Sequence, residues 1–419
     1  MLIGMHTSSI ILVAIVTFVV LEYAFWAAVN FLNERSKNQP LSPQGAEIFN
    51  SDEYSKSMAY DSARFRLELF TKTISTAVSL LAITLGWFAL LDEKLRSRID
   101  SGLLVTVSFV GLLIILMAVV KLPINYYSTF VIEEEFGFNK STKGLFFADS
   151  IKQLVLSLLL GLPLLYAVAW IYDSLRNQFW LVAWGLFSAV SLFIFVFGAR
   201  IFLPMFNKLK PLPDGELRSA VEEYCQTQGF PLSKLYEMDA SKRSTKLNAF
   251  FSGMGKVKII GLFDTLIEKL SVQETVAVLA HEVGHYKRKH VYSMFAFSSA
   301  QTLIIFSLMG WLLGNSDLSK ALGAEQPSFH LALLAFLLLF TPISTVSELL
   351  GNWLSRRNEY EADQYAIETY PGSREFMDSA LKKLAVESLT NLNPHPLYVA
   401  VNYTHPPILA RLAALQKQL

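Results

Sequence analysis

The sequence predicts a mainly α-helical protein that crosses a membrane several times and carries a smaller polar part with a short β element. Hydrophobic residues make up 53% of the 419 residues and charged residues only 17%, whereas soluble domains are usually about a quarter charged. The apolar residues gather in runs of about 20, the length that a helix needs to cross the hydrocarbon of a bilayer. The lipid bilayer is therefore an expected partner.

Seven segments are expected to span the bilayer: 9–32, 72–91, 102–122, 152–172, 179–204, 291–314 and 329–353. Gly161 and Pro163 interrupt the fourth segment and Pro342 the last, which membrane helices tolerate when neighbouring helices satisfy the freed backbone groups. The first segment lacks a preceding basic region and is longer than the apolar part of a signal peptide. We interpret it as a permanent anchor.

Basic residues near the ends of these segments predict the orientation of the chain. One side carries most of them: Arg35, Lys37, Lys56, Arg64, Arg66, Lys72, Lys140, Lys143, Lys208, Lys210, Lys287, Arg288, Lys289, Arg356 and Arg357. The opposite side has fewer, although Lys94, Arg96 and Arg98 cluster there. The bias predicts an outside N-terminus, with the polar blocks on the cytoplasmic side of a bacterial inner membrane or an endoplasmic reticulum membrane.

The polar and apolar stretches divide the chain into four expected parts: 1–205 with five spans, 206–290 as a polar block, 291–354 with two spans, and 355–419 as a second polar block. Within the first polar block, Glu216 to Thr227 has the pattern of an amphipathic helix. The β-branched residues of 256–260 favour a strand, and 248–251 could form a second one.

Charge and cysteine content exclude several other classes of protein. The net charge of +1 provides no basic excess, so nucleic acid is not an expected partner. The single cysteine, Cys225, rules out an intrachain disulfide and any paired-cysteine metal or redox site. We expect Cys225 to pack as a small apolar residue.

The first polar block ends in a helix that carries a metal-binding pattern. Ser271 and Glu274 form a capping box, which predicts a helix start that leads into His281. Positions i and i+4 share a helix face, so His281 and His285 can bind one zinc ion while Glu282 takes a proton from the attacking water. Chance would give roughly 0.01 such patterns in this chain. The pattern predicts zinc-dependent peptide hydrolysis with one Zn²⁺ per chain; a transporter or receptor with a vestigial metal site is the alternative.

A catalytic zinc site usually has three protein ligands, and the best candidate for the third lies in 355–363. If this stretch is helical, Glu359 and Asp363 share a face and Glu361 points away. Glu359 would then bind zinc, and Asp363 would accept a hydrogen bond from a ligand histidine. Two alternatives stay open, namely a solvated acidic helix face and Glu361 as the ligand.

The residues 281–285 followed by 355–363 resemble the CAAX prenyl protease 1 family of membrane zinc proteases. Four further stretches are similar to that family in the same order: 122–140, 241–251, 261–266 and 403–407. The resemblance implies seven transmembrane helices that form a barrel around an internal chamber, capped by a zincin-like catalytic domain. It also implies removal of the last three residues of a peptide or protein substrate after a prenylated cysteine.

The resemblance implies a role for each matching residue. The zinc ligands would be His281, His285 and Glu359, and Glu282 would be the general base. Asn248 would hold the substrate main chain, with the substrate running along Ala249 and Phe250. His405 and Arg411 would support the substrate or the oxyanion.

Two positions depart from the family pattern. Lys246 and Leu247 stand where eukaryotic members commonly have histidine and serine, and the chain is somewhat shorter than those enzymes. These departures are compatible with a bacterial-type member. They also leave an alternative function open, a membrane quality-control protease without preference for prenylated substrates.

Overall fold

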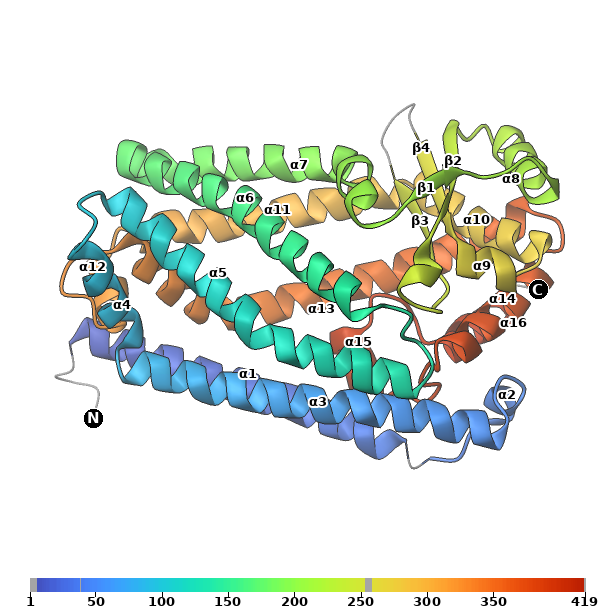
Figure 1. Ribbon diagram of the computed structural model, residues 1–419, viewed down its shortest axis with the longest axis horizontal. Helices are drawn as coiled ribbons and strands as arrows, with labels where there is room; N and C mark the ends of the chain where they lie inside the picture. The colour runs from blue at the N-terminus through green and yellow to red at the C-terminus, as the bar shows by residue number, and fades with distance from the viewer. Residues whose placement is uncertain (1–5, 38, 253–257, 418–419) are drawn as a thin grey trace.

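The protein is an elongated bundle of long helices with a compact mixed α/β part at one end (Figure 1). The computed structural model describes residues 6–37, 39–252 and 258–417. The N-terminus lies at the end of the bundle that is remote from the α/β part, whereas the C-terminus lies within that part. The polar blocks are therefore gathered at one end of the molecule.

The long helices are α1 (Thr7–Ser36), α3 (Ser51–Thr84), α5 (Gly102–Tyr127), α6 (Lys143–Leu175), α7 (Phe179–Phe206), α11 (His290–Leu312) and α13 (Phe329–Thr369). They pack as successive neighbours: α3 on α1, α1 on α13, α13 on α11, α11 on α7, α7 on α6 and α6 on α5. Large apolar side chains remain exposed along them, among them Phe70, Val119, Ile151, Leu159 and Trp311. So much exposed apolar surface is typical of helices in contact with lipid.

A multi-pass membrane protein is confirmed, while the number of seven spans stays a prediction. Six stretches of the described chain are long and apolar enough to cross a membrane, and the longest, Lys143–Phe206, contains both α6 and α7. These two helices are separated by the short 3-10 turn η2 (Arg176–Gln178). The expected segment 329–353 is part of one helix that continues to Thr369, so α13 connects the bundle directly to the α/β part.

The expected second span, 72–91, differs from the observed helices. α3 begins much earlier, because Asn50 and Glu53 form a capping box at its N-terminus. It ends before Gly86, which adopts φ +69°, and α4 (Trp87–Arg96) is a separate helix. A glycine tolerates this left-handed conformation, which an L side chain rarely adopts, and so the chain turns there instead of continuing to residue 91.

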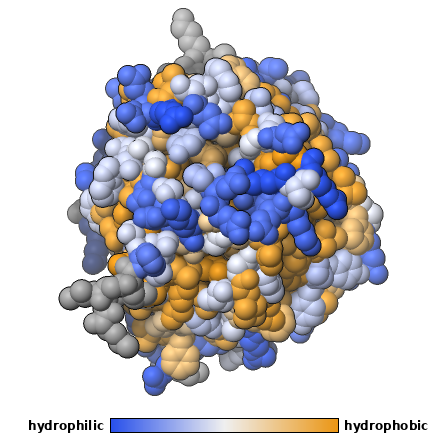
Figure 2. Space-filling model, turned by 90° about the vertical axis from the view of Figure 1, so that its left-hand side faces the viewer, coloured by the Kyte–Doolittle hydropathy of each residue, from blue (hydrophilic) through white to orange (hydrophobic). Residues whose placement is uncertain are grey.

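The end of the bundle opposite the α/β part is closed by α4 and α12 (Ser316–Ala321). Figure 2 shows hydrophilic side chains gathered on this end with hydrophobic ones around them. Beneath the surface, Asp92 of α4 lies 2.8 Å from His330 Nε2 and pairs with Arg96. This buried pair joins α4 to α13, so His330 has a structural role.

The sheet of the α/β part has the strand order β1-β2-β4-β3. Its strands are β1 (Leu209–Pro211), β2 (Leu232–Met238), β3 (Ala249–Ser252) and β4 (Lys258–Phe263). β2 is parallel to β4, and the other pairs are antiparallel. The predicted strand 248–251 is confirmed as β3, one residue further on. The predicted strand 256–260 begins outside the described residues, and β4 continues beyond it to Phe263.

Helices pack around this sheet and around α10 (Val272–Lys287), which carries the metal-binding pattern. They are α8 (Glu216–Thr227), which packs on α10 and β2, α9 (Asp264–Lys269), which packs on β4, and α14 (Ser373–Glu387), which packs on α10. α16 (Ile408–Lys417) packs on α14, and α15 (Pro396–Asn402) packs on α13. α2 (Pro43–Ala46) precedes α3, and the π-helical turn η1 (Ser128–Glu133) follows α5. The predicted helix at 216–227 is confirmed. Cys225 is buried in this core, where burial raises the pKa of its thiol to about 12. Its predicted packing role is confirmed.

The predicted capping box fixes the start of α10. Ser271 Oγ accepts a hydrogen bond from the Glu274 backbone N–H at 3.2 Å, and the Ser271 N–H donates to Glu274 Oε2 at 2.7 Å. Glu274 also accepts hydrogen bonds from Ser379 and Lys383 of α14. The cap therefore both begins α10 and anchors it to α14.

Candidate metal centre and active site

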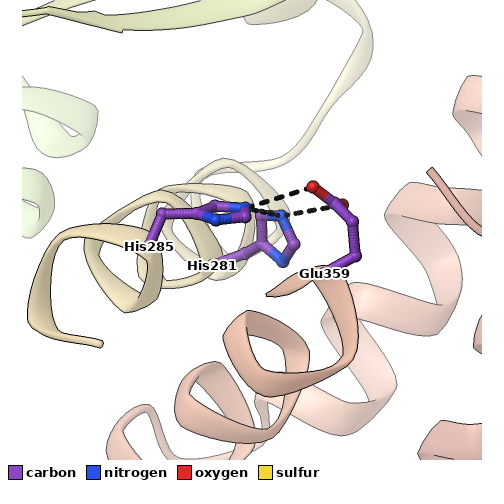
Figure 3. Close-up of side chains that lie close together, drawn as sticks. All are labelled: His281, His285 and Glu359. Atoms are coloured by element: carbon purple, nitrogen blue, oxygen red, sulfur yellow. Dashed lines mark hydrogen bonds and ion pairs between the residues drawn. The ribbon is translucent and has the colours of Figure 1, made fainter. Parts of the chain in front are cut away.

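Two helices bring the three predicted ligands together (Figure 3). His281 and His285 lie one turn apart on α10, with their Nε2 atoms 3.1 Å apart. α13 packs across α10 and places Glu359 Oε1 3.2 Å from His285 Nε2 and Glu359 Oε2 3.4 Å from His281 Nε2. Within the described part of the chain, this is the group of histidine, cysteine and acidic side chains whose donor atoms converge as metal ligands would.

The geometry and charge of this group fit a zinc ion. Donors that lie about 2.0–2.1 Å from one tetrahedral ion are about 3.4 Å from each other, close to the separations found here. Glu359 Oε2 is buried without a hydrogen-bond partner; Arg411 Nη1, at 3.7 Å, is beyond hydrogen-bond distance, so a bound cation would offset the cost of burying this charge. Two imidazoles and one carboxylate are also a known donor set of catalytic zinc sites.

Glu361 does not belong to this group, so the geometry favours Glu359 over the alternative ligand. Glu361 Oε2 lies 3.1 Å from His290 Nε2 and Glu361 Oε1 accepts a hydrogen bond from Arg357 at 3.0 Å. Its position follows from helical spacing, because a residue two positions from Glu359 points to a different side of α13.

Gly284 allows α10 and α13 to come this close. A Cβ atom at this position would lie 3.0 Å from the Ala362 carbonyl oxygen, 3.1 Å from Ala362 Cα and 3.2 Å from Tyr365 Cβ. Two of these neighbours are backbone atoms of α13, which cannot move without moving the helix. The glycine in the metal-binding pattern therefore sets the distance between the helix with the two histidines and the helix with Glu359.

We expect Gly284→Ala to weaken metal binding and to destabilise the protein by about 1–3 kcal/mol, the usual cost of overpacking. The added methyl group would push α13, and with it Glu359, away from the histidines. Zinc affinity and the thermal unfolding midpoint of the purified protein measure the two effects. Gly161→Ala is the matched control, because a Cβ there meets nothing within 4 Å; equal zinc affinity in both variants would contradict the prediction.

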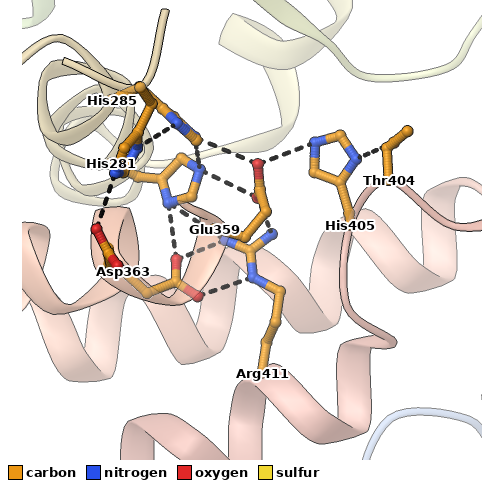
Figure 4. A network of polar contacts seen from close by, with 9 residues as sticks. His281, His285, Glu359, Asp363, Thr404, His405 and Arg411 are labelled. Atoms are coloured by element: carbon orange, nitrogen blue, oxygen red, sulfur yellow. Dashed lines mark hydrogen bonds and ion pairs between the residues drawn. The ribbon is translucent and has the colours of Figure 1, made fainter. Parts of the chain in front are cut away.

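Asp363 and Arg411 hold the outer side of His281 (Figure 4). His281 Nδ1 lies 2.7 Å from Asp363 Oδ1, and Arg411 donates to both oxygens of Asp363 at 2.9 and 2.6 Å. With Nδ1–H donating to the carboxylate, the lone pair of Nε2 points toward Glu359. Burial lowers the pKa of His281, but the neighbouring carboxylates of Asp363 and Glu359 outweigh it and raise the pKa to about 9. The surroundings of His281 therefore favour a positive charge at Nε2, the nitrogen that faces Glu359.

His405 approaches the same carboxylate from the segment between α15 and α16. Its Nε2 lies 3.4 Å from Glu359 Oε1, and its Nδ1 lies 3.0 Å from Thr404 Oγ1. The side chain is 65% exposed, unlike the buried Arg411 on α16. Both predicted support residues thus reach the site, one from an open position and one from within the core.

A cavity of about 590 Å³ borders the site, and Glu282 and His285 contribute to its wall. Apolar side chains of α7 and α11, including Phe195, Met294 and Phe295, form much of the rest. A concave space of this size with a few polar groups is typical of sites that bind organic ligands. Glu282 therefore faces a space that could admit a substrate.

The predicted substrate-binding residues lie at an edge of the sheet. β3 pairs with β4 and is the last strand in the order β1-β2-β4-β3. Asn248 is exposed just before β3; its Oδ1 accepts from the Ala249 N–H at 2.9 Å, and its carbonyl oxygen accepts from the Phe263 N–H. Asn248 has only these local hydrogen bonds among the described residues, so the structure does not bring it into the group around Glu359.

Lys246, which departs from the family pattern, has a defined position before β3. Its Nζ lies 2.8 Å from Glu133 Oε2 and 2.7 Å from the Tyr60 hydroxyl, and 4.5 Å from the centre of the Phe138 ring. These contacts join the start of β3 to η1 and α3. These partners of Lys246 could not be predicted from the sequence, because they are more than 100 positions away along the chain.

His290 was also missed by sequence reasoning, which assigned it no functional partner. It lies five residues after His285, a spacing that does not share a helix face, yet their Nδ1 atoms are 3.1 Å apart. The contact arises because the chain turns between α10 and α11. No feature of the sequence pattern indicated that turn.

Comparison with known proteins agrees with a multi-pass membrane protein that carries a metallopeptidase part. Residues 30–208 match the family described as CAAX prenyl protease N-terminal, five membrane helices, and residues 211–419 match peptidase family M48. The chain is 34% identical to CAAX prenyl protease 1 of Saccharomyces cerevisiae, covering 95% of this chain and 93% of that protein. It is 33% identical to the Oryza sativa homologue, with 96% of each covered.

A human relative and a solved structure extend the comparison. The human CAAX prenyl protease 1 homologue is 31% identical over 90% of this chain and 88% of its own length. The crystal structure of Ste24p from S. mikatae has a TM-score of 0.91 and 31% identity, and the match covers 97% of this chain and 99% of that one. The chain therefore belongs to the CAAX prenyl protease 1 family and is a membrane metalloendopeptidase of the M48 type.

Proposed function

We propose that this protein is a zinc endopeptidase that removes the C-terminal tripeptide of prenylated CAAX proteins. The observation that carries the proposal is the convergence of His281, His285 and Glu359, from two helices, on one point with the donor separations of a zinc ion. The names of the relatives at 31–34% identity support the substrate class. One zinc ion per chain would be held by these three residues.

The proposed reaction is metal-assisted hydrolysis of a peptide bond. Bound zinc supplies a Lewis acid that polarises the scissile carbonyl and lowers the pKa of water toward about 7. Glu282, in the cavity wall, takes the proton of the attacking water and returns it to the leaving amine. His405, exposed beside Glu359, would donate a hydrogen bond to the oxygen that becomes negative.

Arg411 and Asp363 would support the metal site through His281 Nδ1, the ring nitrogen that does not face Glu359. Arg411 donates both of its hydrogen bonds to carboxylates to Asp363. Its Nη1 atom lies 3.7 Å from Glu359 Oε2, too far for a hydrogen bond. We therefore assign Arg411 to holding Asp363, and Asp363 to holding the tautomer and ring orientation of His281. This places Arg411 further from the substrate than the resemblance implied.

The substrate would bind as an extended chain added to β3. An edge strand presents unpaired N–H and C=O groups to which a peptide can pair, and β3 is such an edge. Ala249 and Phe250 would supply main-chain contacts, and the exposed Asn248 would hold the substrate backbone by its side-chain amide.

Gly261→Ala is expected to lower kcat/KM by about 10- to 100-fold, the cost of misplacing a reacting group by about 1 Å, without loss of zinc. The ring of Phe250 covers Gly261, and a Cβ there would lie 2.1 Å from Phe250 Cε1, so the ring and β3 must move. Steady-state kinetics and metal analysis test this. Gly215→Ala, at a glycine with open space around it, is the control; unchanged kcat/KM in Gly261→Ala would exclude β3 as the substrate edge.

The helix bundle would form a seven-helix barrel around an internal chamber, with the α/β part and the catalytic side in the cytoplasm. Support comes from the successive packing of neighbouring helices from α3 to α5, from η1, which contacts both α5 and α3, and from the gathering of the polar blocks at one end. Basic residues near the helix ends support the orientation.

A cleavage assay on purified protein tests the function. A prenylated CAAX peptide and its unmodified twin are incubated with and without a zinc chelator, and the released tripeptide is measured. We expect cleavage of the prenylated peptide, its loss with chelator, and its return on adding zinc. Equal cleavage of both peptides would replace the prenyl specificity by a general quality-control role, and chelator-resistant cleavage would overturn zinc catalysis.

A further inference from the structure

His290 and Glu361 form a hydrogen-bonded chain behind His285, on the side of the ring opposite Glu359. His285 Nδ1 lies 3.1 Å from His290 Nδ1, and His290 Nε2 lies 3.1 Å from Glu361 Oε2. Arg357 Nε donates to the other oxygen of Glu361 at 3.0 Å. The chain therefore runs from the candidate ligand, through a second imidazole, to a carboxylate at the surface.

Only one assignment of donors and acceptors fits this hydrogen-bonded chain when the rings are neutral. A carboxylate only accepts, so His290 Nε2 must carry the hydrogen that points to Glu361. In the neutral ring, His290 Nδ1 is then an acceptor, and the hydrogen between the two rings belongs to His285 Nδ1. This leaves the lone pair of His285 on Nε2, the atom that faces His281 Nε2 and Glu359.

We propose that His290 and Glu361 are positioning residues that fix the tautomer and ring orientation of His285 for zinc binding, an inference that rests on the zinc site proposed above. The two ligand histidines are then supported differently. His281 donates directly to Asp363 at 2.7 Å, whereas His285 reaches a carboxylate only through His290. Partners of this kind commonly change metal affinity by about 10- to 100-fold.

The turn between α10 and α11 makes the contact possible. Lys289 adopts φ 60° and ψ 27° just before His290 begins α11, and this left-handed residue ends the regular helix after His285. An uninterrupted helix would carry a residue five positions on to a different face. Instead, His290 is buried against His285, because Lys289 holds a conformation that L side chains rarely adopt.

The inner and outer ends of the hydrogen-bonded chain differ in solvent exposure. The His290 side chain is 6% exposed, while that of Glu361 is 38% exposed and also pairs with Arg357. Loss of the His290 ring should therefore have the larger effect, because it removes the direct acceptor for His285. Neutralising Glu361 removes the charge that orients His290 but keeps an oxygen in place.

Zinc affinity measured by chelator competition on the full chain in detergent tests the proposal. We expect His290→Ala to raise the zinc dissociation constant about 10- to 100-fold. His290→Asn, whose Oδ1 takes the place of Nδ1 but does not reach Glu361, should lie between His290→Ala and wild type. Glu361→Gln should show a smaller rise, and Glu368→Gln, an exposed acid on the same helix, should match wild type.

Two further readouts separate positioning from direct contact with substrate, since His290 also borders the cavity. The absorption spectrum of the cobalt-substituted protein should shift in His290→Ala, and at saturating zinc kcat should fall with little change in KM. A dissociation constant and cobalt spectrum in His290→Ala equal to those of Glu368→Gln would overturn the proposal. So would a rise in KM with zinc affinity intact.

His285→Ala distinguishes failure of this inference from failure of the zinc site itself. If His285→Ala loses zinc while His290→Ala keeps it with wild-type affinity, only the positioning role is wrong. If His285→Ala retains wild-type zinc affinity, the proposed metal site is wrong. His290→Asn and Glu361→Gln keep most of the side-chain volume, so the graded series is still measurable if His290→Ala folds poorly.

Discussion

Glu282→Gln is expected to lower the rate of peptide hydrolysis by about 10²–10⁴-fold, the usual contribution of a general base, while the protein keeps its zinc. Glutamine preserves the shape of the side chain but cannot take up a proton at neutral pH. Glu282 lines the cavity beside His285 and is not one of the three converging donors. Activity should therefore fall while metal content stays the same.

Single-turnover kinetics on the prenylated peptide and elemental analysis of the same sample measure the two effects. Glu368→Gln makes the same chemical change at an exposed position of α13 and should retain activity. If Glu282→Gln cleaves at the wild-type rate, Glu282 is not the base. Loss of zinc in this variant would instead point to a role in metal binding.

Glu359→Ala is expected to remove bound zinc and, with it, all peptidase activity. The substitution deletes the only carboxylate among the three donors and leaves His281 and His285 as the remaining ligands. A buried Arg411 would also lose one of its neighbouring negative charges. The fall in affinity should exceed the about 10- to 100-fold change that loss of an outer partner causes.

Glu361→Ala provides the comparison for this prediction, because it removes a carboxylate two residues away on the same helix. At saturating zinc it should hold one ion per chain, although its affinity should be reduced through His290. Elemental analysis after dialysis against a defined zinc concentration distinguishes the two variants. Zinc retained in Glu359→Ala and lost in Glu361→Ala would make Glu361 the ligand.

Much of the fold could be predicted from the sequence because a membrane restricts the choices. A backbone inside lipid must satisfy its own hydrogen bonds, so long apolar runs form helices, and the helices α1, α5, α6, α7, α11 and α13 fall on predicted segments. The end of the second predicted segment, 72–91, was placed too late, because the left-handed turn at Gly86 cannot be detected from hydropathy. β3, part of β4 and α8 followed from local patterns, whereas β1 and β2 were not predicted.

The site was predictable wherever its residues share one helix. The spacing of His281 and His285 is a property of helical geometry, and the capping box at Ser271 indicated that the segment is helical. Glu359 required one further assumption, that 355–363 is also helical, which α13 confirms. Spacing showed that Glu359 and Glu361 point to different sides of the helix and favoured Glu359, but Glu361 stayed open as the ligand until the structure showed which side faces the histidines.

The sequence by itself therefore determined the membrane helices, the histidine pair with its acid, and the carboxylates on the neighbouring helix, all of which depend on local periodicity. Only the tertiary structure decided how these parts meet. The closeness of α10 and α13 depends on a missing side chain at Gly284, and the contact of His290 with His285 depends on the left-handed Lys289. Such contacts arise from packing and backbone turns between elements, and the residue pattern within a single element cannot predict them.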